Sequence, residues 1–239
     1  MTRITTGKSS HKEEHLKSSV FITDIVIGMA DGLTVPFALA AGLSGAVQSN
    51  GVVITAGIAE IVAGSIAMGL GGYLAGKTAQ EHFLSELKRE YDEVDKIPEK
   101  EKEEVKLVFA QYGLNEITQN TIADELAKDN DKWVDFMMKY ELGLEKPDVN
   151  RARNSAATIG ISYIIGGLIP LSAYFFTQTP FQGLLFSVLL TIICLFNFGY
   201  FKSKFTGQPP FKGGLKVTLI GITAAAAAFV VAKMFNNLF

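Results

Sequence analysis

Five long apolar runs constrain the fold of this 239-residue chain more than any other feature of its sequence. Each run holds about 20 or more residues, enough for an α-helix to cross a hydrocarbon core of roughly 30 Å at about 1.5 Å per residue. The pattern predicts an all-α membrane protein with five transmembrane helices. The runs are residues 20–47, 51–76, 154–177, 181–201 and 214–235.

Charged residues are scarce and unevenly distributed along the chain. They make up 19% of it, whereas about 25% is usual for soluble domains. Residues 77–153 hold 19 of the 24 acidic residues, and no Asp or Glu follows Asp148. This excludes an ordinary soluble domain, a disordered chain and a basic nucleic-acid binder. The single cysteine, Cys194, excludes a disulfide scaffold and a cysteine-based zinc cluster.

The charges of the connecting segments predict how the chain is oriented. Several lysines lie in the N-terminal tail and in the 202–216 link, whereas the links at 47–51 and 177–182 are uncharged. By the positive-inside tendency, the tail, residues 77–153 and the 202–216 link face the cytosol, and the C-terminus lies on the lumenal side. The predicted parts are a tail (1–17), helices one and two (18–76), a small cytosolic helical domain (77–153) and helices three to five (154–239).

The hydrophilic segment between the second and third runs is predicted to be helical. Residues 77–96 contain no Gly or Pro and are rich in Glu, Leu and Lys, so they continue the second helix out of the membrane. Pro98 suits the first position of a new helix, with acidic residues near its positive end. Further helices are expected from Pro98 to about Tyr112, from Asn115 to about Lys128, and from about Asp131 to Gly143.

Three carboxylates fall inside the first two apolar runs, where each costs about 2.5–3.5 kcal/mol on insertion scales. Asp24 and Asp31 are seven residues apart, and Glu60 and Met68 are eight apart, so each pair shares a helix face. The structural interpretation is that each acid is hydrogen-bonded inside the bundle. The functional interpretation is a cation or proton pathway, because no Lys or Arg of the runs is placed to neutralise the acids, and Lys233 lies close to the outer end.

Proline and glycine residues in these runs predict local features of the helices. Pro36 is expected to break the first helix, and irregular backbone at membrane depth is tolerated where it lines a cavity. Gly28 with Gly32, and Gly72 with Gly76, give small-residue spacings that allow close helix packing.

The hydrophilic segment repeats a pattern of paired potential metal ligands. Spacings of i, i+3 and i, i+4 place two side chains on one helix face, and several such faces would form a carboxylate site with one soft sulfur. Carboxylates suit Mg²⁺, Ca²⁺ or Mn²⁺, and a thioether shifts the preference toward Fe²⁺ and similar metals. The alternative to a metal site is that these glutamates are exposed to solvent and bind no metal. The pairs are Glu90 with Glu93, Glu101 with Glu104, and Met137 with Glu141.

The sequence shows no pattern of an enzyme. A di-iron centre needs Glu-x-x-His pairs, and His82 follows Glu81 directly. No nucleophile–base arrangement and no phosphate loop is present, and no cofactor is expected.

Two runs of sequence resemble the vacuolar iron transporter family. Residues 24–45 (DIVIGMADGLTVPFALAAGLSG) resemble its first helix, and residues 64–83 (GSIAMGLGGYLAGKTAQEHF) resemble its second helix and stalk. The five-span layout with a Glu-rich domain is similar too, and the resemblance extends from about residue 18 to the end. It is strongest to the plant members.

The resemblance implies a transporter that moves Fe²⁺, and in some members Mn²⁺ and related metals, from cytosol into the vacuole in exchange for protons. It implies a multi-pass protein of the vacuolar membrane that acts as a homodimer, with the pathway between the first helices of two subunits. The membrane site would be Asp31 and Met68, with Glu60 in the pathway. The cytosolic site would be Glu90, Glu93, Glu101, Glu104, Met137 and Glu141.

Two other classes of function remain open from the sequence. One is a membrane-anchored metal sensor or storage protein whose Glu-rich domain binds iron without flux. The other is a membrane enzyme such as a ferroxidase, against which the missing Glu-x-x-His pairs count.

Overall fold

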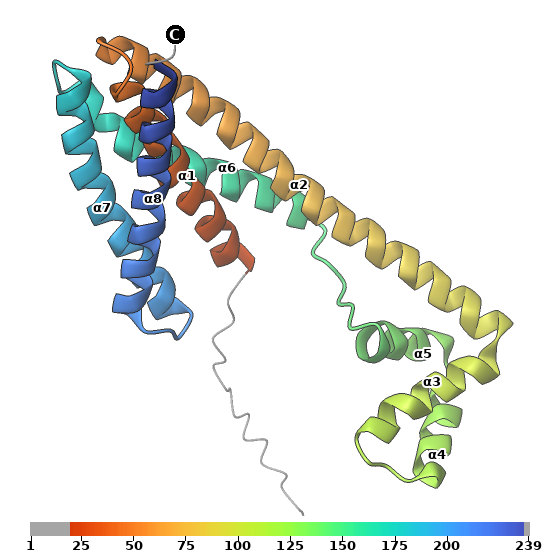
Figure 1. The fold of residues 1–239 in the computed structure, drawn as a ribbon. Coiled ribbons are helices and arrows are strands. Elements are labelled where there is room, and N and C mark those ends of the chain that lie inside the picture. The colour runs from red at the N-terminus through yellow and green to blue at the C-terminus, as the bar shows by residue number, and fades with distance from the viewer. Residues whose placement is uncertain (1–19, 237–239) are drawn as a thin grey trace, which may run out of the picture. The chain divides into compact units, whose positions relative to one another are not determined.

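The structure is a computed structural model that describes residues 20–236 of the chain (Figure 1). The predicted tail at residues 1–17 and the last three residues lie outside this part. Two compact units divide the chain. Of the described residues, 20–68 and 158–236 form one unit, called here the membrane unit, and residues 69–157 form the other, called the hydrophilic unit.

Five helices of the described chain are long and apolar enough to cross a membrane. The described residues are otherwise helical or irregular and contain no strand. The prediction of an all-α membrane protein with five spanning helices is therefore confirmed. The helices are α1 (Val20–Ser44), α2 (Asn50–Lys96), α6 (Arg151–Phe175), α7 (Pro180–Phe205) and α8 (Pro210–Asn236).

Helix α2 is continuous over 47 residues and passes from the membrane unit into the hydrophilic unit. At about 1.5 Å per residue its axis is roughly 70 Å long. The predicted continuation through residues 77–96 is confirmed, because nothing between the apolar run and Lys96 interrupts helical hydrogen bonding.

The expected break at Pro36 is wrong, because α1 runs through this residue as one helix. The ring of Pro36 is buried, and a Cβ at Gly167 of α6 would lie 3.0 Å from its Cγ. The glycine thus leaves room for the proline ring. Tight packing against α6 holds α1 helical at the position where one backbone hydrogen bond is missing.

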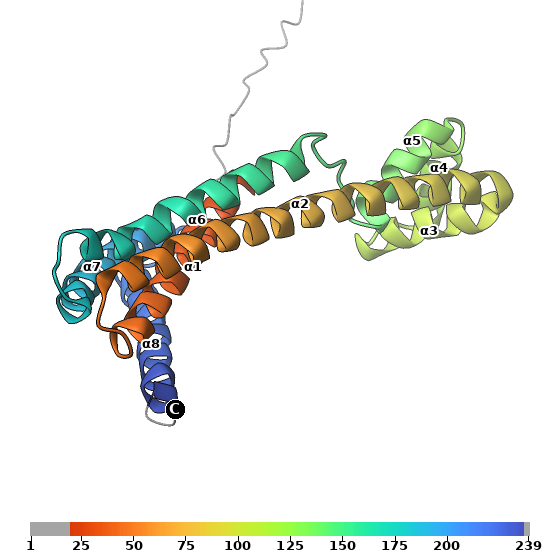
Figure 2. The same cartoon turned by 90° about the horizontal axis from the view of Figure 1, so that it is seen from above.

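Glycines let α1 and α2 approach α6 closely (Figure 2). A Cβ at Gly32 would meet the carbonyl oxygen of Tyr163, and a Cβ at Gly28 would lie 2.8 Å from the Cβ of Ser162. On α2, a Cβ at Gly64 would meet the phenol of Tyr163. The close packing expected for the Gly28 and Gly32 spacing is confirmed, and Tyr163 lies between α1 and α2.

The far ends of these helices are joined by polar contacts. The amide of Asn50, at the start of α2, donates to the carbonyl oxygen of Thr177 (2.5 Å) and to that of Tyr174 (3.2 Å). The hydroxyls of Tyr174 and Ser44 are 2.9 Å apart. These bonds satisfy carbonyls freed at the end of α6 and fasten the α1–α2 link beside it.

The hydrophilic unit adds short helices that pack on the second half of α2. Pro98 occupies the first turn of α3, and Asn115 caps α4 by accepting from the Thr118 amide at 2.9 Å. Gly113 and Gly143 have φ of 78° and 65°, as helix-ending glycines do. The helices are α3 (Pro98–Gln111), α4 (Glu116–Leu126), α5 (Asn130–Phe136) and the π-helical turn η1 (Met137–Glu141).

The last predicted helix of this unit begins within one residue of the expected start, but its second half is not α-helical. Asp129, by accepting from the Lys132 amide at 3.3 Å, caps a helix that begins at Asn130. After Phe136 the chain widens into η1, where the Leu142 amide donates to the Met137 carbonyl at 3.1 Å. Such i→i+5 turns are rare and occur frequently at functional sites.

Substitution of Gly32 by Ala is expected to loosen the packing of α1 on α6, because the new methyl group meets the backbone of Tyr163, which has no flexible side-chain end there. We expect a loss of about 1–3 kcal/mol in unfolding free energy, visible as a lower thermal midpoint in detergent. Gly71→Ala is the matched control, since nothing lies within 4 Å of a Cβ there. Equal midpoints for the two variants would contradict this account.

Candidate functional site

Three carboxylates of the hydrophilic unit gather where α2 ends and α3 begins. Each of Glu90, Glu93 and Glu101 offers an oxygen, and these oxygens lie within 4.8 Å of one another. The turn at Ile97 folds α3 back beside α2, which brings Glu101 to the face that carries Glu90 and Glu93. One member of the second i, i+3 pair, Glu101, therefore meets the first pair in space.

Two of these carboxylates are buried and have oxygens without a hydrogen-bonding partner among the described residues. Glu90 is 1% exposed and Glu101 is 0% exposed. One oxygen of Glu90 and both oxygens of Glu101 have no hydrogen bond. Leaving an ionised carboxylate buried and unpaired is costly, so the cluster favours a proton or a cation at this point.

Mutual repulsion and burial raise the pKa values of the cluster. Loss of hydration, followed by the charges of Glu104 and Glu90, raises the pKa of Glu101 from an ordinary value of 4.5 to about 7. The pKa of Glu141 also rises to about 7, through loss of hydration and then through Glu104 and Glu90. Loss of hydration is the main cause of the raised pKa of Glu90. Glu104 and Glu141 thus belong to the same electrostatic cluster.

Arg89 is the nearby cation that the sequence analysis missed. Its guanidinium lies 3.0 Å from Glu86, 3.4 Å from Glu93 and 3.7 Å from Glu90. The i, i+4 spacing to Glu93 was the signal available in the sequence. The Arg89 side chain is 52% exposed, so its charge lies at the solvent-facing rim of the cluster. It does not pair with the buried oxygens of Glu101.

Met137 reaches the same region from η1. It is fully buried in an apolar core with Val105, which follows Glu101 by one turn of α3, and with Trp133. The π-helical turn carries Met137 at its start and the exposed Glu141 at its end. The structure thus places the charge of Glu141 in the cluster and the sulfur of Met137 in the core beside α3.

Glu60 of the membrane unit has a partner that the sequence analysis did not identify. The hydroxyl of Tyr163 in α6 donates a hydrogen bond to one oxygen of Glu60, and the other oxygen is buried without a partner. Tyr163 is 2% exposed, and its phenol occupies the space left by Gly64. In the sequence, the one feature that could have indicated this partner was a tyrosine within an apolar run.

Asp31 lies in the same part of the membrane unit. The next residue, Gly32, packs on the backbone of Tyr163. Asp31 is half-buried, whereas Asp24 is only 3% exposed. The two aspartates share a face by spacing but have different surroundings, because the neighbouring helices cover one turn of α1 and not the other.

Met68 is half-buried on α2. It lies eight residues after Glu60, about 12 Å farther along the helix axis at 1.5 Å per residue. It is Glu60, and not Met68, that is hydrogen-bonded to α6, the helix that packs on α1 beside Asp31. The pairing of Met68 with Asp31 stays a prediction from helix register.

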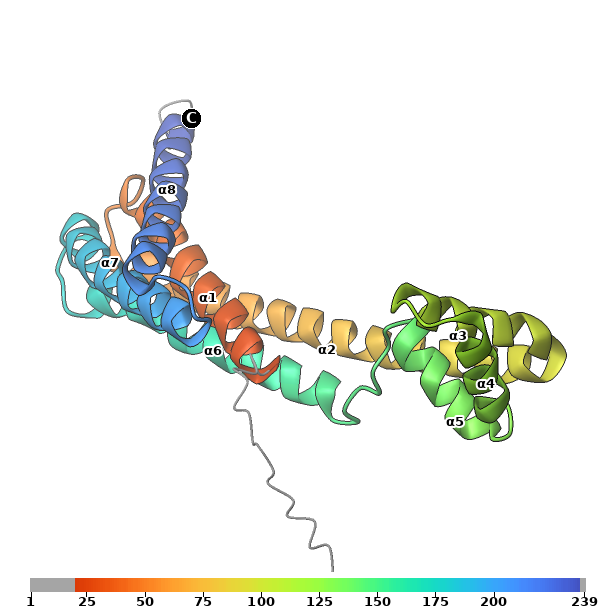
Figure 3. The ribbon, with the colours of Figure 1, turned by 90° about the horizontal axis from the view of Figure 1, so that it is seen from below.

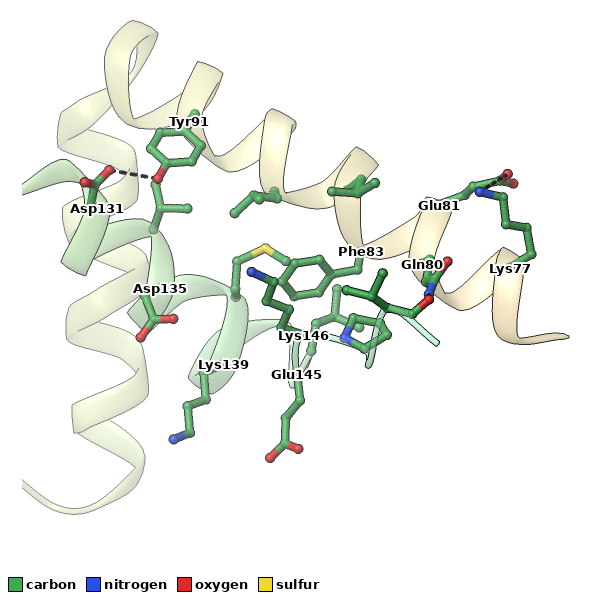
Figure 4. A pocket seen from close by; sticks show the side chains of 17 residues that line it. Lys77, Gln80, Glu81, Phe83, Tyr91, Asp131, Asp135, Lys139, Glu145 and Lys146 are labelled. Carbon is green, nitrogen blue, oxygen red and sulfur yellow. Dashed lines mark hydrogen bonds and ion pairs between the residues drawn. The ribbon is translucent and has the colours of Figure 1, made fainter. Parts of the chain in front are cut away.

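A cavity of about 610 Å³ lies in the hydrophilic unit, lined by residues of α2, α5, η1 and the segment after η1 (Figure 4). Its lining is largely apolar, with Phe83, Leu87 and Met138 among the residues that form it. At its rim, the Asp131 carboxylate already has a partner, because the Tyr91 hydroxyl donates a hydrogen bond to it at 2.8 Å. The cavity has no convergent carboxylates and is a less suitable metal site than the glutamate cluster.

Comparisons with known proteins agree with this architecture. The family model described as the VIT family matches residues 22–233. The chain is 49% identical to "Vacuolar iron transporter 1" of Arabidopsis thaliana over 95% of its length and 91% of the relative's. It is 48% identical to the tulip (Tulipa gesneriana) protein of that name, over 95% and 92%. It is 40% identical to "Protein CCC1" of Saccharomyces cerevisiae, over 90% and 69%.

Metal-free protein is expected to lose stability as the pH rises through the raised pKa of Glu101. Between the ordinary pKa of 4.5 and the raised pKa of about 7, the folded state keeps a proton on Glu101 that the unfolded state releases. The stability that the Glu101 carboxyl contributes is therefore complete below about pH 4.5 and lost as the pH passes about 7. In chelator, the unfolding midpoint reported by Trp133, the sole tryptophan, should fall between about pH 5 and pH 8. Glu101→Gln should flatten this decline.

Glu99→Gln is the control for that measurement, because Glu99 lies on the same helix with its side chain 90% exposed. The control should keep the full decline. A decline as steep in Glu101→Gln as in Glu99→Gln would contradict the role given to the buried carboxyl.

Proposed function

The chain belongs to the VIT family, and on that premise we propose that it moves Fe²⁺ across the vacuolar membrane from the cytosol into the vacuole. The names of its relatives support iron as the substrate and the vacuole as the destination. The observation that carries the proposal is a pair of carboxylates, Asp31 and Glu60, within spanning helices. Among the described residues, no Lys or Arg forms an ion pair with either.

The glutamate cluster serves as the cytosolic capture site in this proposal. Six residues supply it: Glu90, Glu93, Glu101, Glu104, Met137 and Glu141. The support is the unpaired buried oxygens of Glu90 and Glu101 and the shared charge of the other glutamates. Carboxylates with one thioether suit Fe²⁺ and also accept Mn²⁺, so we include Mn²⁺ among the substrates.

We propose that Asp31 and Met68 hold the metal within the membrane and that Glu60 exchanges it for a proton. A carboxylate binds either a metal ion or a proton, which couples the two flows. Tyr163 positions Glu60 by donating to one of its oxygens and leaves the other free. Protons from an acidic lumen would neutralise these carboxylates and release the metal on that side.

The chain is proposed to act as a homodimer. Ile27 and Val35, one turn before and one turn after Asp31, are 40% and 44% exposed. The face of α1 that carries Asp31 is thus left open by the other described helices. A carboxylate facing lipid is costly, and a second copy covering this face would place two Asp31 residues beside one pathway.

The proposed orientation places residues 77–153 in the cytosol and the C-terminus in the lumen. If each of the five helices crosses the membrane once, the tail, the hydrophilic unit and the α7–α8 link would share one side. The lysines of that link support the cytosolic assignment of this side.

Asp31→Asn is expected to abolish Fe²⁺ uptake into proteoliposomes that are acidic inside, because the amide cannot exchange a metal for a proton. Uptake should fall at least a hundredfold, while binding to the glutamate cluster persists. The native protein should respond to the pH gradient. Asp135→Asn, which alters an exposed acid of α5, is the matched control and should transport normally.

Other outcomes point to other functions. Stoichiometric metal binding with no uptake by the native protein would favour a membrane-anchored sensor or storage protein. Oxidation of Fe²⁺ by the purified protein would favour a ferroxidase. Normal uptake by Asp31→Asn would overturn the assignment of the membrane site.

Glu90→Gln combined with Glu101→Gln is expected to weaken capture without ending transport. The Fe²⁺ concentration at half-maximal uptake should rise about tenfold or more, since a ligand loss of about 1.4 kcal/mol is a factor of ten. The maximal rate should change less. Quenching of Trp133 fluorescence by the metal should shift in parallel. A complete loss of uptake here, with normal uptake in Asp31→Asn, would reverse the two roles.

A further inference from the structure

A group of four lysines is concentrated at the hairpin between α7 and α8. The hairpin lies at the end of the membrane unit where α1 begins (Figures 1 and 3). Lys202 and Lys204 lie in the last turn of α7, and Lys212 and Lys216 lie in the first two turns of α8. All four residues are exposed.

The two helices of the hairpin approach each other closely through their backbones. A Cβ at Gly199 would lie 2.6 Å from the carbonyl oxygen of Gly213, and one at Gly214 would lie 2.9 Å from that of Phe196. Gly207, with φ of 69°, ends α7, and the next amide donates to the Ser203 carbonyl at 2.8 Å. The two helix ends thus keep the four lysines together.

The charge of this lysine group is not neutralised within the described chain. No ion pair joins any of the four lysines to another described residue, and no Asp or Glu follows Asp148 in the sequence. Asp24, near the start of α1, is 3% exposed and so faces inward. Among the described residues, these four like charges therefore have no ion-pair partner.

The helix dipoles favour only two of the four lysines. Lys202 and Lys204 lie at the negative end of α7, where a cation is favourable. Lys212 and Lys216 lie near the positive end of α8, where a cation is locally unfavourable. An external negative charge would offset this cost, and it would have to reach both helix ends at once.

The surroundings of the lysines indicate the chemistry of the partner. Three phenylalanines on the same turns, Phe201, Phe205 and Phe211, are 50%, 59% and 66% exposed. Aromatic side chains beside lysines are typical of the boundary between hydrocarbon and headgroups. Basic segments next to spanning helices attract anionic lipids at about 1 kcal/mol per residue near the surface.

We propose that the α7–α8 hairpin is a binding site for the phosphate headgroups of anionic phospholipids. The lysines of both helix ends contact the headgroups, and the phenylalanines contact the adjoining acyl chains. Anionic lipid bound here stabilises the packing of α7 on α8. The occupant is membrane lipid and not a soluble phosphate compound.

The test compares the full chain in nanodiscs of phosphatidylcholine alone and of phosphatidylcholine mixed four to one with phosphatidylserine. The anionic lipid retained per protein after extraction into mixed detergent micelles is counted by mass spectrometry. Replacing all four lysines by Gln should reduce the retained anionic lipid about tenfold and remove the rise in thermal midpoint that phosphatidylserine gives the native chain. Replacing all four by Arg, which preserves the charge, should keep both.

Lys128→Gln with Lys132→Gln, two exposed lysines of the hydrophilic unit, is the control and should behave like the native chain. The proposal is overturned if the four-Gln variant retains as much anionic lipid as the native chain. It is also overturned if inorganic phosphate raises the midpoint in phosphatidylcholine as much as phosphatidylserine does, because the ligand would then be a soluble anion.

Discussion

The cost of holding a negative charge in apolar surroundings is the constraint on which the rest of this structure depends. Glu60 within the membrane unit and Glu101 within the hydrophilic unit each keep buried oxygens without hydrogen bonds. Burying an ionised carboxylate without partners is costly in free energy, so such positions need a compensating interaction. Both units therefore contain a buried carboxylate with an oxygen that no described residue satisfies by a hydrogen bond.

The packing around α6 is what makes such sites stable. Glycines at positions 28, 32 and 64 let three helices approach until the Tyr163 phenol fills the space between them. Tyr163 then satisfies one oxygen of Glu60 and leaves the second unpaired. In the hydrophilic unit, an apolar core around Trp133 and Met137 supports the glutamate cluster in the same way. Dense packing thus compensates locally for the unfavourable burial of charge.

Much of this architecture was accessible from the sequence, because it depends on local rules. Helix length, the continuation of α2 past Gly76, the position of Pro98 and the cap at Asn115 all follow from short stretches of residues. The failures involve long-range contacts. The break expected at Pro36 does not occur because Gly167, distant in sequence, receives the proline ring. The π-helical turn at Met137 carries no local signal that we recognise.

The sequence by itself determined the five spanning helices, the carboxylates within them and the paired glutamates, since periodicity and hydropathy act along one helix at a time. Only the tertiary structure decided which of these side chains meet. It brought Glu101 to Glu90 and Glu93 through the turn at Ile97. It joined Glu60 to Tyr163, which is 103 residues away. The physical reason is that burial and charge pairing depend on neighbouring helices, whose positions the spacing within one helix does not specify.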